Sequence, residues 1–293
     1  MRIAVVGARG QLGAAAVHEL RTHHHVTALD RAALDITDGA AVSELFERMR
    51  PDAIINCTGY NLVDAAEDHP VEALQVNAFG VRSLARAAVA HGAVLVHYGS
   101  DFVFDGRATA PYTEEDRLNP RGVYAASKML GEWFAEDAPR RYVLRVESLF
   151  GSAPEGAPAK GSVAAIIRGL RAGMPVRVFE DRTVSPTYVL DAARATRTLV
   201  ESGAPHGLYH CVNSGVCTWL EFAQEAARQL GVEPRLEAIR QADLKLRAER
   251  PQYCALSNRK LTAAGATMPP WQDALAHHLE SLSHDFTDQL SDR

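Results

Sequence analysis

Three glycines in the first turn of the chain constrain the fold more than any other feature of the sequence. They are Gly7, Gly10 and Gly13, and they stand between the apolar run Arg2–Val6 and a helical apolar pattern at Gln11–Thr22. Gly7 permits a tight turn, Gly10 lets the backbone approach a phosphate, and Gly13 lets the helix pack against the sheet. The free N–H groups at the start of a helix also attract anions. The turn predicts a dinucleotide-binding site; an ordinary strand-to-helix turn with spare glycines is the alternative.

The first half of the chain alternates short apolar strands with helices. We expect strands at Arg2–Val6, His25–Leu29, Ala53–Asn56, Ala93–Tyr98 and Tyr142–Val146. We expect helices between them at Gln11–Thr22, Asp38–Met49, Val71–His91 and Tyr124–Asp137. Such alternation implies right-handed crossovers and a parallel sheet covered on both faces. The predicted fold class is therefore α/β, with a doubly wound parallel sheet of the Rossmann type.

The second half is less regular, and it divides from the first at a segment rich in Ala, Pro, Gly and Ser, residues 152–161. Residues 1–150 are expected to form an NAD(P)-binding domain. Residues 151–293 are expected to form mainly a smaller C-terminal α/β lobe that binds the substrate, with a segment near 186–200 returning to the core.

Composition excludes several classes of protein. The formal net charge is −5, so neither nucleic acid nor an anionic membrane surface is an expected partner. No apolar stretch approaches the roughly 20 residues that span a bilayer, and the N-terminal apolar run is too short for a secretory signal. The four cysteines are scattered and contain no CxxC pair, so neither a disulfide framework nor a metal site is expected. A reducing cytoplasm is the predicted location.

An acidic residue follows the second predicted strand, where it can bind the adenosine end of a cofactor. A carboxylate at Asp30 can accept hydrogen bonds from the ribose hydroxyls, which favours NADH. Guanidinium groups at Arg31 or Arg9 can instead pair with a 2′-phosphate, which allows NADPH. Both coenzymes stay open, and Asp35 and Ile36 are expected to flank the adenine. The complete set of expected cofactor residues is Gly7, Gly10, Gln11, Leu12, Gly13, Asp30, Arg31, Asp35, Ile36, Tyr60, Tyr124 and Lys128.

Ser100, Tyr124 and Lys128 are the expected catalytic residues. Tyr124 and Lys128 are four residues apart at the start of a helix, so they share one face. A nearby ammonium should stabilise the phenolate and lower the pKa of Tyr124 from its usual ~10. Ser100 ends the fourth strand, at the edge of the sheet where ligands bind. Together these groups can reduce a ketone, with Tyr124 as the general acid and Ser100 bound to the carbonyl oxygen.

On these motifs the chain resembles the extended short-chain dehydrogenases/reductases, and within them the dTDP-4-dehydrorhamnose reductase family. Further matching segments are Gly10–Gly13, Pro51–Asn56, Val63–Glu67, Val76–Ala78, Ser100–Gly106 and Ser185–Tyr188. The resemblance implies reduction of the 4-keto group of a nucleotide-linked, dTDP-type 6-deoxyhexose with NADH or NADPH. It also implies that Tyr60 lies near the cofactor. The Ala-rich segments Val71–His91 and Val123–Ala138 can pair with a second subunit in a homodimer; simple packing on the sheet is the alternative. The substrate residues expected by position are Val63, Asp64, Asp101, Phe102, Glu147 and Ser148.

The chain departs from the family pattern around the expected sugar pocket. Glu147 stands where a serine is usual, and Ser148 replaces a tryptophan that packs on the sugar. Arg182 follows Asp181 where a glutamine is usual, and Ser100 replaces a threonine but keeps the hydroxyl. Two alternatives remain open: a nucleotide-sugar 4-epimerase, and a non-catalytic NAD(P)-binding subunit like the regulatory subunit of methionine adenosyltransferase.

Overall fold

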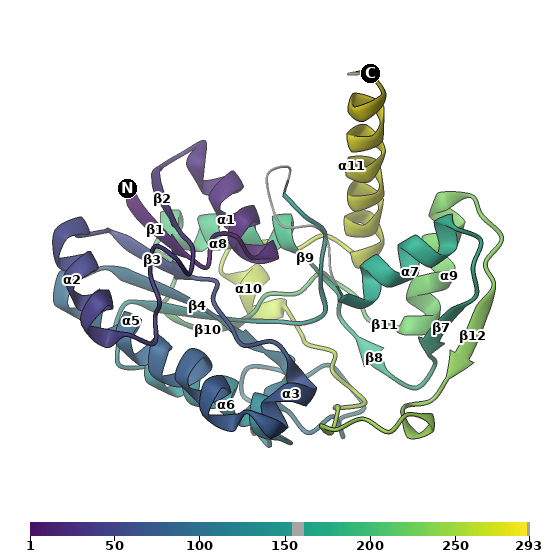
Figure 1. Cartoon of the computed structure of the whole chain (residues 1–293), viewed down its shortest axis with the longest axis horizontal. Coiled ribbons are helices and arrows are strands. Elements are labelled where there is room, and N and C mark those ends of the chain that lie inside the picture. Colours follow the sequence, from purple (N-terminus) through teal and green to yellow (C-terminus); the bar gives the residue numbers. More distant parts are fainter. Residues whose placement is uncertain (154–160, 292–293) are drawn as a thin grey trace.

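The core of the protein is one parallel sheet of six strands (Figure 1). The computed structural model describes the backbone at residues 1–153 and 161–291 and side chains as far as residue 282. The strands are β1 (Arg2–Val6), β2 (His25–Leu29), β3 (Ala53–Asn56), β4 (Val94–Ser100), β5 (Arg141–Val146) and β10 (Gly207–His210). They lie in the order β10-β5-β4-β3-β1-β2, and every neighbouring pair is parallel. The predicted α/β fold class is confirmed.

Helices cover both faces of this sheet because its strands are apolar on both sides. Ile3 and Val5 pack into a cluster with α1 (Gln11–Arg21) and α8 (Val189–Ser202), whereas Ala4 and Val6 pack with the opposite layer. That second layer contains α2 (Gly39–Met49), α5 (Gly80–His91) and α6 (Val123–Ala135) (Figure 1). This two-sided burial explains why the strands lack a strict apolar–polar alternation.

The helix expected at Val71–His91 is broken into three parts. The helix α4 (Pro70–Leu74) leads into one π-helical turn, η1 (Gln75–Phe79), and α5 then continues to His91. Gly92 ends it with φ = 63°, the left-handed conformation typical of a glycine C-cap. A short helix, α3 (Val63–Asp68), precedes α4. The π turn lies beside α6, which contains the expected catalytic residues Tyr124 and Lys128, and single π turns are frequent at functional sites.

The C-terminal half contributes to the main sheet and also forms a separate group of helices and short strands. Besides α8 and β10, it contains a parallel pair, β7 (Val176–Phe179) and β12 (Leu236–Ile239), and an antiparallel pair, β8 (Thr183–Val184) and β11 (Cys217–Thr218). A third pair joins β6 (Leu149–Phe150) to β9 (Thr187–Tyr188). The remaining elements are α7 (Gly161–Arg171), α9 (Trp219–Leu230), α10 (Arg259–Ala263), α11 (Trp271–Ser291), and the 3₁₀ turns η2 (Asp101–Val103) and η3 (Gln241–Asp243).

An apolar cluster of its own stabilises this C-terminal group of helices and short strands. It packs α7, α9 and the first turns of α11 around Phe150, Phe222 and Trp271. Most of the linker expected at 152–161 lies outside the described residues. Among the residues that the structure describes, no helix combines the length and the apolar composition that crossing a membrane requires.

Candidate active site

The glycine turn lies at the carboxyl edge of the sheet, where β1 and β3 are neighbours although β2 follows β1 in the chain. Such a switch point is where ligands bind in open α/β sheets. Gly7 has φ = 81°, and its N–H donates to the Leu29 carbonyl at 2.8 Å. A Cβ on Gly13 would lie 2.2 Å from the Gly7 carbonyl oxygen, so this turn tolerates no side chain there. The bare backbone and the start of α1 therefore fit a bound pyrophosphate.

The residues expected at the adenosine end form a mixed set in the structure. Asp30 directly follows β2, and its carboxylate lies 2.8 Å from the Arg9 guanidinium. Arg31 extends into solvent 3.6 Å from Asp35. Asp35 accepts hydrogen bonds from the backbone and the hydroxyl of Thr37, which together hold its pKa below the usual value. The Asp35 carboxylate thus stabilises its own turn.

Three other expected cofactor residues turn their side chains away from the turn. Gln11 donates from its amide to the Gly151 carbonyl at 2.6 Å, and so ties α1 to the chain after β6. Leu12 is buried in the apolar cluster between the sheet and the helices α1 and α8. Ile36 is buried in the cluster on the opposite face of the sheet. For Leu12 and Ile36 only the backbone remains to meet a cofactor.

Ser100, Tyr124 and Lys128 meet at the end of β4. All three are buried, with exposures of 5%, 8% and 4%. The Ser100 hydroxyl donates to an Asp101 carboxylate oxygen at 3.1 Å and accepts from the Phe102 N–H at 3.2 Å. The Ser100 hydroxyl also acts on the phenol of Tyr124, where it favours the ionised form. Lys128 donates from Nζ to the Tyr98 carbonyl at 2.6 Å, which fixes its ammonium group between α6 and β4.

Burial dominates the electrostatics of these groups. It raises the pKa of Tyr124 to about 12, against the opposing effect of the Ser100 hydrogen bond. It lowers the pKa of Lys128 to about 8, although the Glu132 carboxylate one turn further along α6 acts in the other direction. The expectation that Lys128 lowers the pKa of Tyr124 is wrong for the chain alone, because desolvation of the phenolate outweighs any charge effect. A proton therefore stays on Tyr124 at neutral pH, as an acid for reduction requires.

Polar contacts hold α6 in place from two sides. Asn77, in the π turn η1, bonds the backbone N–H and carbonyl of Tyr60 at 2.8 and 3.0 Å and the Ser127 hydroxyl at 2.9 Å. Glu132 forms a buried ion pair with Arg145 of β5 at 2.8 Å. The loop after β3, the catalytic helix and the sheet are therefore fixed relative to one another.

Apolar side chains surround the phenol of Tyr124. Tyr60, Val63 and Phe102 pack in the same small cluster, and the Phe102 ring meets the tyrosine edge-on at a centroid distance of 5.3 Å. Asp64 lies elsewhere: its carboxylate accepts from the Ala248 N–H at 3.0 Å and from Arg250 at 2.7 Å. Asp64 thus joins α3 to the C-terminal half rather than contacting the catalytic residues.

The expected substrate residues Asp101 and Glu147 form a buried cluster behind Ser100. Oxygen atoms of both carboxyl groups and the Cys254 sulfur lie within 4.8 Å of one another. The Arg182 guanidinium lies 3.6 Å from that sulfur and 5.7 Å from the centre of the Phe102 ring. Because this guanidinium already supplies a positive charge, we assign no metal to the cluster. Ser148 follows Glu147 with φ = 44°, a left-handed conformation that is uncommon for serine.

Cys254 and Arg182 are neighbours of the site that sequence reasoning did not place there. Cys254 lies far from the motifs in the chain and outside any helix or strand, so no local pattern marks it. The sequence marked Arg182 and Glu147 only as two separate departures from the family pattern. In the structure the two side chains belong to the same cluster. Their opposite charges interact, since Arg182 acts to lower the pKa of Glu147 and Glu147 acts to raise that of Arg182.

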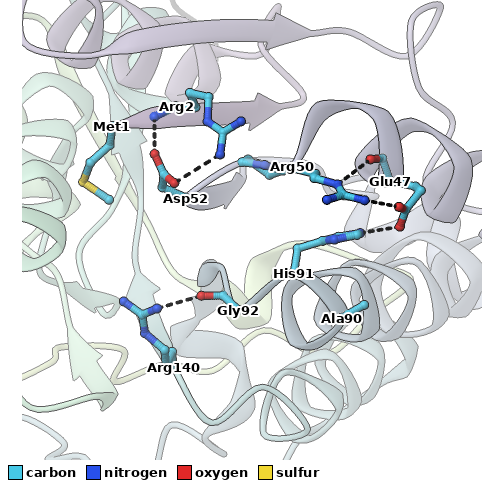
Figure 2. Close-up of a pocket in the computed structure, with 10 residues that line it drawn as sticks. Met1, Arg2, Glu47, Arg50, Asp52, Ala90, His91, Gly92 and Arg140 are labelled. Atoms are coloured by element: carbon cyan, nitrogen blue, oxygen red, sulfur yellow. Dashed lines mark hydrogen bonds and ion pairs between the residues drawn. The ribbon is translucent and has the colours of Figure 1, made fainter.

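A polar hollow of about 600 Å³ opens at the opposite edge of the sheet (Figure 2). It is lined where β1, β3, β4 and β5 begin, by Met1, Arg2, Glu47, Arg50, Pro51, Asp52, Ala90, His91, Gly92 and Arg140. Its charged side chains bond one another or the backbone, as the Arg50–Glu47 pair does at 2.6 Å. The hollow lies at the amino ends of the strands, away from the glycine turn and Tyr124, and we do not assign the active site to it.

The fold and the constellation at the carboxyl edge define an oxidoreductase of the extended short-chain dehydrogenase/reductase type. The chain matches the family described as RmlD substrate binding domain over residues 1–284, and it belongs to that family. It is similar to a dTDP-4-dehydrorhamnose reductase of Streptomyces griseus, with 37% identity over 287 residues, 95% of this chain and 93% of the relative.

Two solved structures have the same fold along nearly the whole chain. One is a dTDP-4-dehydrorhamnose reductase of Clostridium acetobutylicum, with a TM-score of 0.90 and 31% identity, covering 97% of this chain and 100% of the other. The second is a dTDP-4-dehydrorhamnose reductase of Bacillus anthracis in complex with NADP. It has a TM-score of 0.89 and 30% identity, and the match covers 96% of this chain and 99% of the other.

Proposed function

We propose that the protein reduces the 4-keto group of a dTDP-linked 6-deoxyhexose with NADPH or NADH. The observation that carries this proposal is the convergence of Ser100, Tyr124 and Lys128 at the carboxyl edge of the sheet, beside the glycine turn. The similarity to reductases of this activity supports the same substrate class.

Each of the three residues has one role in this reaction. A bound nicotinamide supplies the hydride to the carbonyl carbon. Tyr124 gives its phenolic proton to the oxygen, which becomes the new hydroxyl group, and Ser100 donates a hydrogen bond to the same oxygen. Lys128 holds a positive charge under the site, where it stabilises the phenolate that remains. Phe102 and Val63 exclude water from the phenol.

The coenzyme is proposed to bind with its pyrophosphate at Gly7, Gly10 and Gly13 and its adenosine end near Asp30. The relative from Bacillus anthracis was solved with NADP, which supports NADPH. Asp30 supports NADH, because its carboxylate can accept from the ribose hydroxyls. The exposed Arg9 guanidinium now pairs with Asp30 and is positioned to turn toward a 2′-phosphate instead.

A cytoplasmic homodimer is the proposed state of the enzyme. Aromatic side chains on η1 and α6 remain uncovered, with Phe79 44% and Trp133 63% exposed. The centre of the Phe134 ring lies 5.5 Å from that of Trp133 and 5.8 Å from that of Phe79, so the three rings form one patch across η1 and α6. A second copy of the chain would cover it. Sedimentation velocity on the chain and on a Trp133→Lys variant tests this: a wild-type dimer that the variant dissociates supports the patch as the interface, whereas a wild-type monomer contradicts it.

The decisive experiment follows NADPH and NADH oxidation at the nicotinamide absorbance with enzymatically generated dTDP-4-keto-6-deoxyhexoses. Turnover that needs both ketone and coenzyme is the expected result, and the faster coenzyme settles the preference. Tight coenzyme binding without turnover would contradict the proposal. Conversion of the sugar without net coenzyme oxidation would indicate an epimerase, and a stable complex with a second protein would indicate a regulatory subunit.

A further inference from the structure

The cluster behind Ser100 contains more acid than its hydrogen bonds can satisfy. We call Asp101 and Glu147 the carboxyl pair; their exposures are 3% and 2%. One oxygen of each, Asp101 Oδ2 and Glu147 Oε1, is buried without a hydrogen-bond partner among the described residues. The facing Arg182 likewise has its Nε without one. Buried carboxylates are normally paired or hydrogen-bonded throughout, so unpartnered oxygen atoms indicate that the pair is not doubly ionised.

Charge counting leads to the same conclusion. Two ionised carboxyl groups within 4.8 Å of each other would face a single guanidinium in a buried site. Burial raises the pKa of Asp101 to about 6, and it raises the pKa of Glu147 well above its usual value, with the Asp101 charge adding to the effect. The other titratable groups against the pair are Tyr124, Cys217, Tyr253 and Cys254. None of these four supplies a cation, so the pair retains a proton near neutral pH.

The Ser100 hydroxyl links the carboxyl pair to the phenol of Tyr124. Ser100 is hydrogen-bonded to Asp101 at 3.1 Å on one side, and on the other its hydroxyl acts on the phenol of Tyr124, whose pKa it lowers. A serine hydroxyl has only one hydrogen to donate. While that hydrogen points at an ionised Asp101, Ser100 cannot donate it to a substrate carbonyl. When the proton of the pair lies on the bonded Asp101 oxygen, the direction of this bond reverses, and the Ser100 hydrogen is free.

We propose that the carboxyl pair is a buried proton store that restores the proton of Tyr124 through Ser100 after each reduction. The proposal rests on the proposed function. The phenolic O–H of Tyr124 breaks as the new hydroxyl O–H of the product forms. The Ser100 proton then moves to the phenolate, and Ser100 takes a proton from the Asp101 oxygen that it contacts. The pair is left with one additional negative charge beside Arg182, and it regains a proton from solvent before the next turnover.

The test separates the first reduction from the return of the proton. Single-turnover and steady-state rates of NADPH oxidation are measured with a dTDP-4-keto-6-deoxyhexose in H₂O and D₂O. The chain is compared with Glu147→Gln, which keeps the acceptor for the Ser185 N–H but cannot store a proton. We expect the single-turnover rate to change less than about twofold, while kcat falls about tenfold or more and its solvent isotope effect rises.

Two further variants control for structural damage. Glu147→Asp keeps a carboxyl group, and it should restore most of the lost kcat. Glu225→Gln makes the same carboxyl-to-amide change on α9, far from Tyr124, where Glu225 bonds Arg228, and it should behave as the wild type. Equal losses in both rates for Glu147→Gln, or no loss in either, would overturn the proton store.

An infrared measurement tests the store without turnover. The difference spectrum between pH 5 and pH 8 should contain the C=O band of a protonated carboxyl group, and Glu147→Gln should weaken that band while Glu225→Gln leaves it. Absence of the effect overturns the proposal. If the wild type turns over but Glu147→Gln loses both rates equally or neither, the proton store alone fails. If the wild type oxidises neither NADPH nor NADH with a dTDP-4-keto-6-deoxyhexose, the proposed function fails and the store fails with it.

Discussion

The two edges of the six-stranded sheet both carry charged side chains, but they satisfy them differently. At the amino edge, Arg2 pairs with Asp52, Arg50 with Glu47, and Arg140 donates to the Gly92 carbonyl at 2.7 Å (Figure 2). At the carboxyl edge, the carboxyl pair and Arg182 keep unpartnered atoms in the part of the chain that the structure describes. The hollow of about 600 Å³ lies at the first edge, and the expected catalytic residues lie at the second. At the second edge the expected catalytic residues therefore occur together with unpartnered buried polar atoms, whereas paired charges line the hollow at the first edge.

The largest effect should come from removing the acid at the carboxyl edge. Tyr124→Phe keeps the ring and its contact with Phe102 but has no proton to donate, so kcat should fall about 10²- to 10⁴-fold. The dissociation constant for NADPH, measured by fluorescence titration, should change little. A large loss of coenzyme affinity would instead assign Tyr124 to binding.

A pH effect on stability should follow, because the same edge buries a carboxyl group. The pKa of Asp101 is raised from 3.8 to about 6, so the folded state binds its proton more tightly than the unfolded state does. The resulting stability is fully present below about pH 4 and is lost as pH rises through 6, by about 3 kcal/mol at most. Urea unfolding of Asp101→Asn between pH 4 and 7 should show a flatter profile than the wild type.

The control for this pH effect has the opposite sign. Hydrogen bonds from Arg228 hold the pKa of Glu225 below its usual value, so this group adds stability as pH rises. Glu225→Gln should therefore slightly reduce stability at neutral pH and leave the acid limb unchanged. An Asp101→Asn profile parallel to that of the wild type would show that Asp101 titrates normally.

A smaller, selective effect is expected at the adenosine end of the same edge. Asp30→Ala should raise KM for NADH about tenfold, the cost of one hydrogen bond to a charged group. KM for NADPH should change less, since Arg9 is released from its pair with Asp30. The ratio of kcat/KM for the two coenzymes measures this, and an unchanged ratio would remove Asp30 from the ribose site.

The smallest effect should come from the amino edge. Arg140→Ala removes an exposed contact to the Gly92 carbonyl, and stability should fall by about 0.5 kcal/mol or less. The activity with ketone and NADPH should equal that of the wild type within error. A clear drop in kcat/KM would break the comparison between the two edges, because it would give the paired charges a part in function.

Local patterns were enough to predict most of the N-terminal half. The strand at His25–Leu29 and that at Ala53–Asn56 have the predicted bounds, because short apolar runs between turn residues specify buried strands. The glycine turn and the i, i+4 spacing of Tyr124 and Lys128 are equally local. The break at Gln75–Phe79 was missed, since its sequence favours a continuous helix and Asn77 bonds groups remote in the chain, Tyr60 and Ser127.

The environment of the site depends on contacts that no local pattern specifies. Glu147 and Arg182 were noticed one at a time, and only the fold brings them to the same cluster with Cys254. The pKa of Tyr124 was misjudged for a related reason. Spacing along a helix shows that Lys128 is near, but it does not show how much water the surrounding loops remove from the phenol.

The strand β10 comes late in the sequence, and this position affects how the chain folds. Residues 207–210 form the edge strand of the sheet beside β5, and α8 packs beside α1 on one face of the sheet. The main core therefore includes residues from Ile3 to Met268. A nascent chain that ends near residue 150 exposes an unpaired strand edge and an apolar helix layer, which promote aggregation. We expect the NAD(P)-binding half to need its C-terminal partner in cis, and the slow step of folding to be the long-range pairing of β10 with β5.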